Sequence, residues 1–230
     1  MQQSVEKQAA AAAPVAAPSG ILFPMAKRAL DIGVCLVAAV LLAPVFAVVT
    51  IAIKLTSPGP VFFRGIVHGK DGKPFTYYKF RSMSAGTSLQ KHQEFIQNYV
   101  LRDEGHTDKS GKRVFKLIED PRITPVGKII RRLSIDEFPQ MINVFKGDMS
   151  IVGPRPPVPY EYELYDDVKK LRLKVKPGIT GLNQIRRRGQ SSFQQMWEDD
   201  LEYIRRQSLA LDLYIMLKTP IVMLFGSGPT

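Results

Sequence analysis

The sequence has very little cysteine and comparatively few acidic residues. Cys35 is the only cysteine among 230 residues, so the chain cannot close an internal disulfide and nothing indicates an oxidising compartment. Lysine and arginine total 32 against 21 aspartates and glutamates, a net charge of +11. This excess predicts an anionic partner, such as nucleic acid, an acidic membrane surface or a phosphate-bearing substrate. Because no recognisable nucleic-acid-binding motif is present, we expect no nucleic-acid partner.

Charge is also absent from the run Ile32–Ile53, which contains no lysine, arginine, aspartate or glutamate. As a helix, this stretch would be roughly 33 Å long, enough to cross the hydrocarbon core of a bilayer. A buried core helix is the alternative interpretation, but so long a charge-free run is rare in soluble domains. The sequence therefore predicts a membrane-inserted helix near the N-terminus.

The flanks of this run leave its topology open. Lys27 and Arg28 precede it, and Lys54 follows it, so both ends favour the cytoplasmic side under the positive-inside rule. Pro44 lies at the centre, where it removes one backbone hydrogen bond and favours a kink. A helix bent there can enter and leave through the same face, and a kinked spanning helix is the alternative.

The rest of the chain predicts an α+β domain between an Ala/Pro-rich tail and an apolar C-terminus. Residues 1–20 have almost nothing to bury and are expected to be a disordered tail. Two short aromatic runs separated by a Gly/Pro-containing turn predict a β-hairpin. The expected elements are strands at 61–63 and 75–80 and helices at 89–101, 161–174 and 193–207.

The C-terminal run 208–225 is apolar but contains Asp212, Lys218 and Pro220. These interruptions argue against a second membrane span. An amphipathic helix lying in the membrane interface fits the composition, with Lys218 reaching lipid phosphates. A C-terminal core helix is the equally weighted alternative.

A short helix is predicted after Leu133. Ser134 followed three residues later by Glu137 fits a capping box, and Gly147 fits a helix C-terminus, so we expect a helix from about residue 135 to Phe145.

Adjacent carboxylates, Asp136 and Glu137, lie in the first turn of this expected helix. Acidic residues are common there because they offset the helix dipole. However, Arg131 and Arg155 flank this pair in the sequence, and cations beside paired carboxylates suit phosphate chemistry. Cations neutralise phosphate oxygens, a divalent metal takes carboxylate oxygens, and one carboxylate can attack phosphorus.

Several ordered motifs together resemble the bacterial sugar transferase family, the polyprenyl-phosphate hexose-1-phosphate transferases or small monotopic phosphoglycosyltransferases. The densest resemblance runs over Asp120–Pro156. It extends to Lys27–Asp31, Tyr78–Met83 and Lys176–Gly181, and ends near Leu211–Leu213. The resemblance thus covers nearly everything after the tail.

For the fold, the resemblance implies a monotopic membrane protein of the bacterial inner membrane. Residues 21–56 would form a re-entrant helix-break-helix, and residues 57–230 a small, mostly helical catalytic domain facing the cytoplasm, with C-terminal interfacial helices. The break would fall at Ala43 and Pro44, where the family often has serine before the proline.

For the site, the resemblance implies Asp136 as the nucleophile and Glu137 as the ligand of Mg²⁺. Asp200 matches a carboxylate thought to act as a base on the lipid phosphate, although its neighbour Asp199 makes the match less specific. Three basic residues match positions that hold phosphates: Lys79, Arg131 and Arg155.

For the activity, the resemblance implies transfer of a sugar 1-phosphate from a UDP-sugar to undecaprenyl phosphate, with UMP released. This would be the first membrane step of exopolysaccharide, O-antigen or glycoconjugate synthesis, and a homodimer is left open. The family commonly has Asn-Gly-Arg where this chain has Arg186–Arg188, so the resemblance does not determine donor preference. A membrane-bound phosphohydrolase and a non-enzymatic, membrane-tethered polyanion-binding protein are the alternatives.

Overall fold

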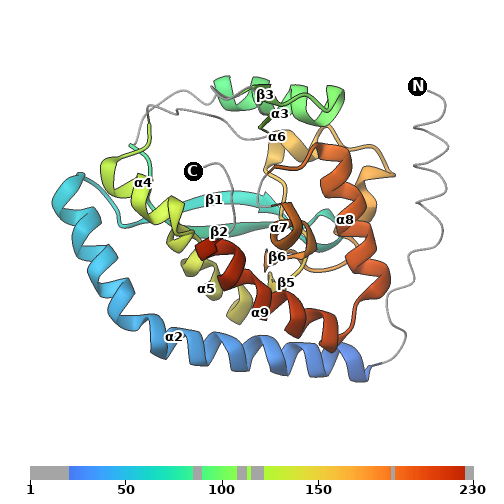
Figure 1. Cartoon of the computed structure of the whole chain (residues 1–230), viewed down its shortest axis with the longest axis horizontal. Helices are drawn as coiled ribbons and strands as arrows, with labels where there is room; N and C mark the ends of the chain where they lie inside the picture. The colour runs from blue at the N-terminus through green and yellow to red at the C-terminus, as the bar shows by residue number, and fades with distance from the viewer. Residues whose placement is uncertain (1–20, 85–89, 108–112, 115–121, 188–189, 226–230) are drawn as a thin grey trace.

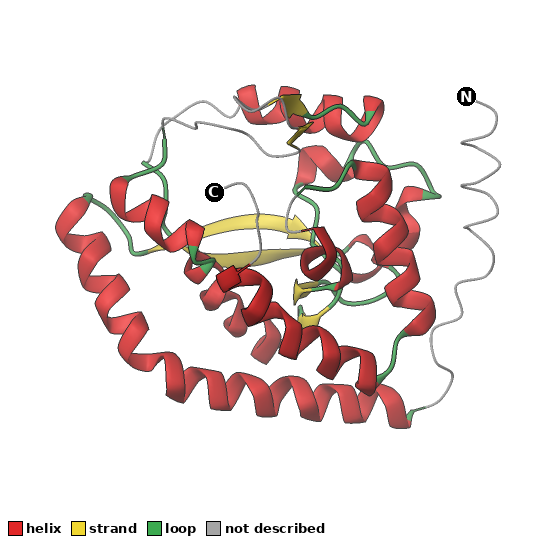
Figure 2. Ribbon diagram, viewed as in Figure 1, coloured by secondary structure: helices red, strands yellow, loops and turns green. Residues whose placement is uncertain are grey.

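The computed structural model describes residues 21–84, 90–107, 113–114, 122–187 and 190–225. Within these ranges the fold is α+β and mostly helical, as expected (Figure 2). The α-helices are α2 (Leu22–Thr56), α3 (Gln90–Arg102), α4 (Pro125–Arg132), α5 (Met141–Lys146), α6 (Pro159–Tyr162), α7 (Leu182–Arg187), α8 (Phe193–Arg206) and α9 (Leu209–Phe225). The strands are β1 (Phe62–His68), β2 (Pro74–Phe80), β3 (His106–Thr107), β4 (Arg113–Val114), β5 (Ser150–Val152) and β6 (Gly178–Thr180). Short 3₁₀ helices are η1 (Lys70–Gly72), η2 (Ile135–Gln140) and η3 (Lys169–Leu173).

The predicted hairpin is confirmed. Strands β1 and β2 pair antiparallel, with Phe62 opposite Phe80 and His68 opposite Pro74. A second pair, β5 and β6, is parallel, with Ser150 opposite Gly178. The backbones meet closely there: a Cβ on Gly178 would lie 2.1 Å from the amide nitrogen of Gly153, so only glycine fits.

Helix α2 is continuous from Leu22 to Thr56, through Pro44. Figure 1 shows that it runs along one edge of the molecule and then bends along a second side. Pro44 lies in the interior of this helix, and its missing amide and ring clash account for the bend. The break expected at Ala43–Pro44 therefore takes the form of a bend in one helix, without an interruption.

Most of α2 is not buried. Its most apolar stretch has a mean hydropathy of 2.9, and 11% of that stretch is buried. Val40 and Leu41 are 75% and 71% exposed, whereas Cys35 and Ile53 are buried against the domain. A core helix would be mostly buried, so the core-helix interpretation does not fit α2, and a large apolar surface is left for another environment.

Two smaller apolar clusters attach α2 to the domain. Cys35 packs with Met141, Val144 and Met149 of the α5 region. Val49 and Ile53 pack with residues of β2 and α4. The main core lies elsewhere, around Trp197 and Leu201 of α8. The hairpin and η2 are thus held between α2 and the helical core.

The expected capping box at Ser134 is wrong. Ser134 has a φ of +53° and its side chain makes no cap hydrogen bond. Its amide still bonds to the carbonyl of Arg131, so Ser134 ends α4 in a left-handed conformation. The next turn is η2, a 3₁₀ helix that contains Pro139, and α5 follows and ends at Gly147 with a φ of +87° as predicted.

The single helix expected over 161–174 is also wrong. Helix α6 ends at Tyr162, and η3 begins at Lys169. The carboxylate of Asp166 accepts a hydrogen bond of 2.7 Å from the Lys169 amide, which starts a new turn instead of continuing the old one. By contrast, the helices predicted at 89–101 and 193–207 are confirmed as α3 and α8.

Helix α9 is one-sided. Asp212 and Ile215 are fully buried, while Leu213, Leu217 and Leu224 are 46%, 71% and 66% exposed. The helix packs against α2, β5, β6 and α7 through its buried side. Its outer side is an exposed apolar stripe. The tail predicted at 1–20 lies outside the described residues.

Candidate active site

The acid pair lies on η2, which packs against β2. Asp136 is 7% exposed. The Glu137 carboxylate accepts a hydrogen bond of 2.9 Å from Nζ of Lys79, and their side chains are 35% and 26% exposed. The alternation of β2 places Tyr77 on the same face as Lys79, whose ammonium lies 5.2 Å from the centre of the Tyr77 ring. The structure thus brings Lys79 to the acid pair from 57 residues earlier in the chain.

The charges of this pair stabilise each other. Burial alone would raise the pKa of Glu137, but Lys79, Arg155 and Gln140 together more than offset this, and the pKa lies below its usual value. Burial would lower the pKa of Lys79, but Glu137, Tyr77 and Asp136 raise it above its usual value. At neutral pH the site therefore holds a carboxylate and an ammonium, with Asp136 within electrostatic reach of the same cation.

Arg155 approaches the acid pair from the turn after β5. Desolvation would lower the pKa of its guanidinium, but the charges of Glu161, Tyr77 and Glu137 raise it. The residue remains exposed. Of the three predicted phosphate-binding residues, Lys79 therefore contacts Glu137, and Arg155 is near enough for its charge to lower the pKa of Glu137.

Arg131 is placed differently. It lies in the last turn of α4, which packs against η2. Its side chain makes no hydrogen bond or ion pair with another residue that the structure describes. Arg131 is thus near η2 in the fold, with its charge unpaired in the described parts of the chain.

Asp200 is buried in a network beneath the Arg155 turn. It is 2% exposed and pairs with Arg172, whose Nη2 and Nε lie 2.6 and 2.9 Å from its Oδ2. Burial raises the pKa of Asp200 to about 6, although Arg172 opposes that rise. Nη2 of Arg172 also donates to the Arg155 carbonyl at 3.0 Å. Asp200 is therefore linked to the candidate site through Arg172, and its carboxylate is not presented at the surface.

Arg172 has further partners that complete this network. Its Nη1 donates to the Tyr165 hydroxyl at 2.6 Å, and that hydroxyl donates to Glu161 at 2.6 Å. A buried arginine with this many partners is held rigidly, so the loop that carries Arg155 is fixed from below.

Asp199 faces a different set of partners from its neighbour Asp200. Its two carboxylate oxygens accept hydrogen bonds from Arg186 at 2.8 Å and from Arg187 at 3.0 Å. The first two arginines of the basic run are thus committed to α8, and Arg188 lies outside the described residues.

Gln140 is a residue of the site that the sequence did not single out. It is 1% exposed, and no described atom accepts a hydrogen bond from its Nε2. In a 3₁₀ helix residues three apart lie above one another, so Gln140 shares a face with Glu137 and helps lower that pKa. In the sequence, the available signal was a glutamine three residues after Glu137.

Polar contacts fix the N-terminal half of α2 to this region. Nζ of Lys27 lies 2.6 Å from the buried Asp212 carboxylate. Asp31 accepts hydrogen bonds from the Ser150 hydroxyl at 3.0 Å and from the Ile151 amide at 3.1 Å. Arg28 donates to the carbonyls of the last turn of α5, where it compensates the helix dipole. Motifs at opposite ends of the chain thus meet where α2 joins the domain.

Comparison with known proteins gives a consistent result. Residues 23–226 match the sequence model of a family described as "Bacterial sugar transferase". The "Exopolysaccharide production protein ExoY" of Sinorhizobium fredii is 37% identical, with 85% of this chain and 84% of that protein covered.

Two longer relatives match over similar parts of this chain. The "Galactosyl transferase CpsE" of Streptococcus agalactiae is 40% identical over 89% of this chain and 43% of its own length. The "UDP-glucose:undecaprenyl-phosphate glucose-1-phosphate transferase" of Escherichia coli is 41% identical over 84% of this chain and 39% of its own length. The chain thus spans less than half the length of these two proteins.

Proposed function

Since the chain belongs to the bacterial sugar transferase family, we propose that it transfers a sugar 1-phosphate from a UDP-sugar to undecaprenyl phosphate. The products are a polyprenyl diphosphate-sugar and UMP. The names of the Escherichia coli and Sinorhizobium fredii relatives support this reaction and a place in exopolysaccharide synthesis. The observation that carries the proposal is the Asp136–Glu137 pair on η2, beside the cations of Lys79 and Arg155.

The first step is attack by a carboxylate oxygen of Asp136 on the phosphorus that bears the sugar. A bond forms between that oxygen and phosphorus, and the bond from phosphorus to the bridging oxygen of the diphosphate breaks. UMP leaves with the electron pair, and a phosphosugar remains on Asp136. Lys79 and Arg155 would supply positive charge to the phosphate oxygens.

The second step regenerates the enzyme. An oxygen of undecaprenyl phosphate forms the new bond to the same phosphorus, and the bond to Asp136 breaks. The carboxylate returns to its starting state, and the lipid carries a diphosphate-sugar. Covalent catalysis of this kind divides one difficult displacement into two easier ones.

The carboxylates present fit a magnesium ion. The described residues contain no group of three or more metal-binding side chains. Magnesium, however, commonly takes one or two carboxylates and fills its remaining positions with water and substrate phosphates. Glu137 would hold it, because Lys79 bonds to Oε1 of that carboxylate and the side chain is partly exposed. When bound, the ion would neutralise and orient the donor diphosphate.

Helix α2 is proposed to be re-entrant in the bacterial inner membrane, with the domain on the cytoplasmic side. Its bend near the middle, its exposed apolar length and the basic residues at both ends support this topology. A site beside α2 would then serve one substrate from water and one from the bilayer.

The reaction is tested by incubating the full chain in detergent with a panel of UDP-sugars, with and without undecaprenyl phosphate. We expect continuous UMP release and a lipid-linked diphosphate-sugar from at least one donor only with the lipid, and at most one UMP per enzyme molecule without it. Free sugar phosphate formed without lipid would identify a phosphohydrolase instead. Retention of polyanions without UMP release from any donor would favour the binding protein.

A further inference from the structure

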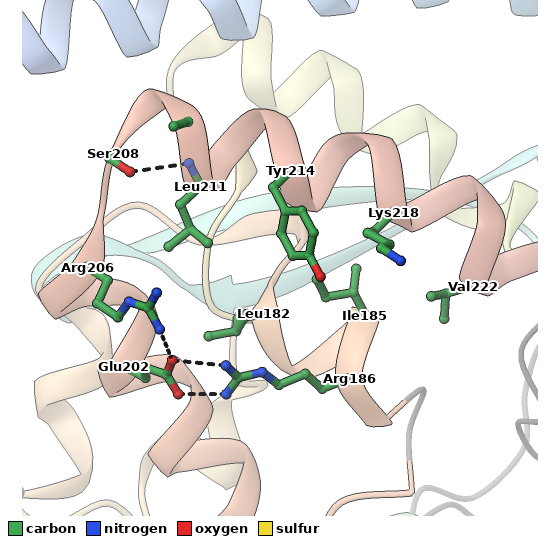
Figure 3. A pocket seen from close by; sticks show the side chains of 11 residues that line it. Leu182, Ile185, Arg186, Glu202, Arg206, Ser208, Leu211, Tyr214, Lys218 and Val222 are labelled. Atoms are coloured by element: carbon green, nitrogen blue, oxygen red, sulfur yellow. Dashed lines mark hydrogen bonds and ion pairs between the residues drawn. The ribbon is translucent and has the colours of Figure 1, made fainter.

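A groove lies between α7, α8 and α9, and none of its lining residues belongs to the candidate active site (Figure 3). Its volume is about 610 Å³. Helix α9 contributes one long side through Leu211, Tyr214, Lys218 and Val222, and α7 and α8 contribute the other. The transfer chemistry proposed above makes no use of this groove.

Positive charge dominates the groove. Lys218 is exposed and has no hydrogen-bonding or ionic partner among the residues that the structure describes. Arg206 is 67% exposed and donates from Nη1 to Glu202 at 2.7 Å, which leaves most of its five donors unused. Arg186 holds both oxygens of the same carboxylate, at 2.6 and 2.9 Å. Glu202 thus serves two arginines at one end of the groove, and Lys218, towards the other end, can bind an anion (Figure 3).

The remaining wall is apolar. Leu182 and Ile185 of α7 face Leu211 and Val222 of α9 across the groove (Figure 3). A free phosphate or a nucleotide would gain nothing from these side chains. An anion with a hydrocarbon chain would gain from both the cations and the apolar wall.

The position of the groove around α9 determines the level at which the groove would open in a membrane. The exposed apolar stripe of this helix is Leu213, Leu217, Ile221 and Leu224. Residues of the groove, Tyr214 and Lys218, each follow a member of that stripe, so they lie roughly 100° around the helix from it. With the stripe in lipid, the groove opens at the level of the phosphate headgroups.

We propose that this groove binds one anionic glycerophospholipid. Its phosphodiester lies against Lys218, and part of an acyl chain lies along Leu182, Ile185 and Val222. The inference requires α9 at a membrane surface but does not depend on sugar phosphate transfer. Lipid binding is therefore measured independently of UMP release.

The test uses the full chain reconstituted in phosphatidylcholine vesicles that contain a small fraction of phosphatidylglycerol with a photoreactive acyl chain. After illumination, the labelled peptides are mapped by mass spectrometry. We expect adducts in Leu182–Arg187 and Leu209–Phe225. Lys218→Gln should lower the yield of these adducts roughly fivefold.

The matched control is Lys91→Gln, which removes an exposed cation from α3, on the opposite side of the molecule from α9 in Figure 1. Its yield should equal that of the parent. Unchanged labelling in the Lys218 variant would overturn the proposal, as would equal labelling by photoreactive phosphatidylcholine. Stronger displacement by undecaprenyl phosphate than by unlabelled phosphatidylglycerol would assign the groove to the acceptor lipid instead.

Discussion

At the scale of single residues, the site depends on how Lys79 and Glu137 offset each other's burial. Each group alone would be pushed towards its neutral form, and each is kept charged by the other. Asp136 contributes to the same balance, since its charge also raises the pKa of Lys79. The proposed nucleophile thus lies within electrostatic reach of the same ammonium as Glu137.

Asp136→Asn should reduce UMP release at least ~10³-fold, because the amide keeps the shape but lacks a nucleophilic oxygen anion. Initial rates with a competent UDP-sugar and undecaprenyl phosphate measure this. Asp71→Asn is the matched control: Asp71 is exposed in the hairpin turn with a φ of +54°, a conformation that asparagine also tolerates. Near-parental activity of the Asp136 variant would refute its role.

Lys79→Met should move the acidic limb of the pH–activity profile upward by at least about one pH unit. In the parent, the pKa of Glu137 is depressed, so the carboxylate persists as the pH falls below its usual range. Without the ammonium, only Arg155 and Gln140 still oppose the effect of burial, so the pKa of Glu137 rises and protonation begins at a higher pH.

The profile of kcat/KM against pH measures the Lys79→Met effect, and Lys73→Met serves as the control because Lys73 is exposed in the turn of the same hairpin. A uniform loss of activity with an unshifted acidic limb would show that Lys79 contributes only to phosphate binding.

At the scale of elements, the sequence predicted those elements whose determinants are local. The aromatic alternation of β2 and the periodicity of α8 were sufficient to predict these two elements. Helix α8 also begins with a capping box between Ser192 and Gln195. The capping box expected at Ser134 does not form, because Ser134 ends the preceding helix α4 instead of starting the next one. Packing decides to which of two adjoining helices a boundary residue belongs, and the sequence does not show that packing.

The candidate site was predictable only in part for the same reason. Asp136, Glu137 and Arg155 are close in sequence, and Lys79 was found only through the family resemblance. Arg172 could not be found, because a lone arginine in a basic segment carries no local sign that it will be buried among Asp200, Tyr165 and the Arg155 carbonyl. That network exists only once η3, α8 and the loop after β5 have packed.

Arg172→Met should lower the free energy of unfolding by about 3–5 kcal/mol, because it leaves Asp200 buried without its countercharge. The loss should be smaller at pH 5 than at pH 8. The pKa of Asp200 is already raised to about 6, so its stabilising contribution is lost as pH rises through that value, and without Arg172 the pKa rises further.

Denaturant unfolding in detergent at the two pH values checks the Arg172 prediction. Lys174→Met, an exposed change in the same segment, should stay within ~0.5 kcal/mol of the parent. Adding Asp200→Leu to Arg172→Met should recover much of the loss. A loss that does not change with pH would mean that Asp200 is not the group left uncompensated.

At the scale of the whole molecule, α2 and α9 present their apolar surfaces outward while their polar contacts lock them together. The Lys27–Asp212 pair joins the two helices, and Asp31 joins α2 to β5 next to the Arg155 turn. The site is therefore built on the same elements that present apolar surface, which suits a reaction between a lipid and a water-soluble donor.

A re-entrant α2 predicts that both of its ends face the same side of the membrane. In a Cys35→Ser background, which removes the only cysteine, Ser4→Cys and Lys91→Cys should both react with an impermeant maleimide only in inside-out vesicles. Labelling of Ser4→Cys in right-side-out vesicles, with Lys91→Cys labelled in inside-out vesicles, would instead establish a kinked spanning helix.

The most direct test of the account maps the phosphosugar on the protein. The full chain is mixed with a competent UDP-sugar in the absence of undecaprenyl phosphate, quenched in acid, digested and sequenced by mass spectrometry. We predict a sugar-phosphate adduct on Asp136 that disappears when the lipid is added before quenching. An adduct on any other residue, or full turnover through a species that never carries phosphosugar, would contradict it.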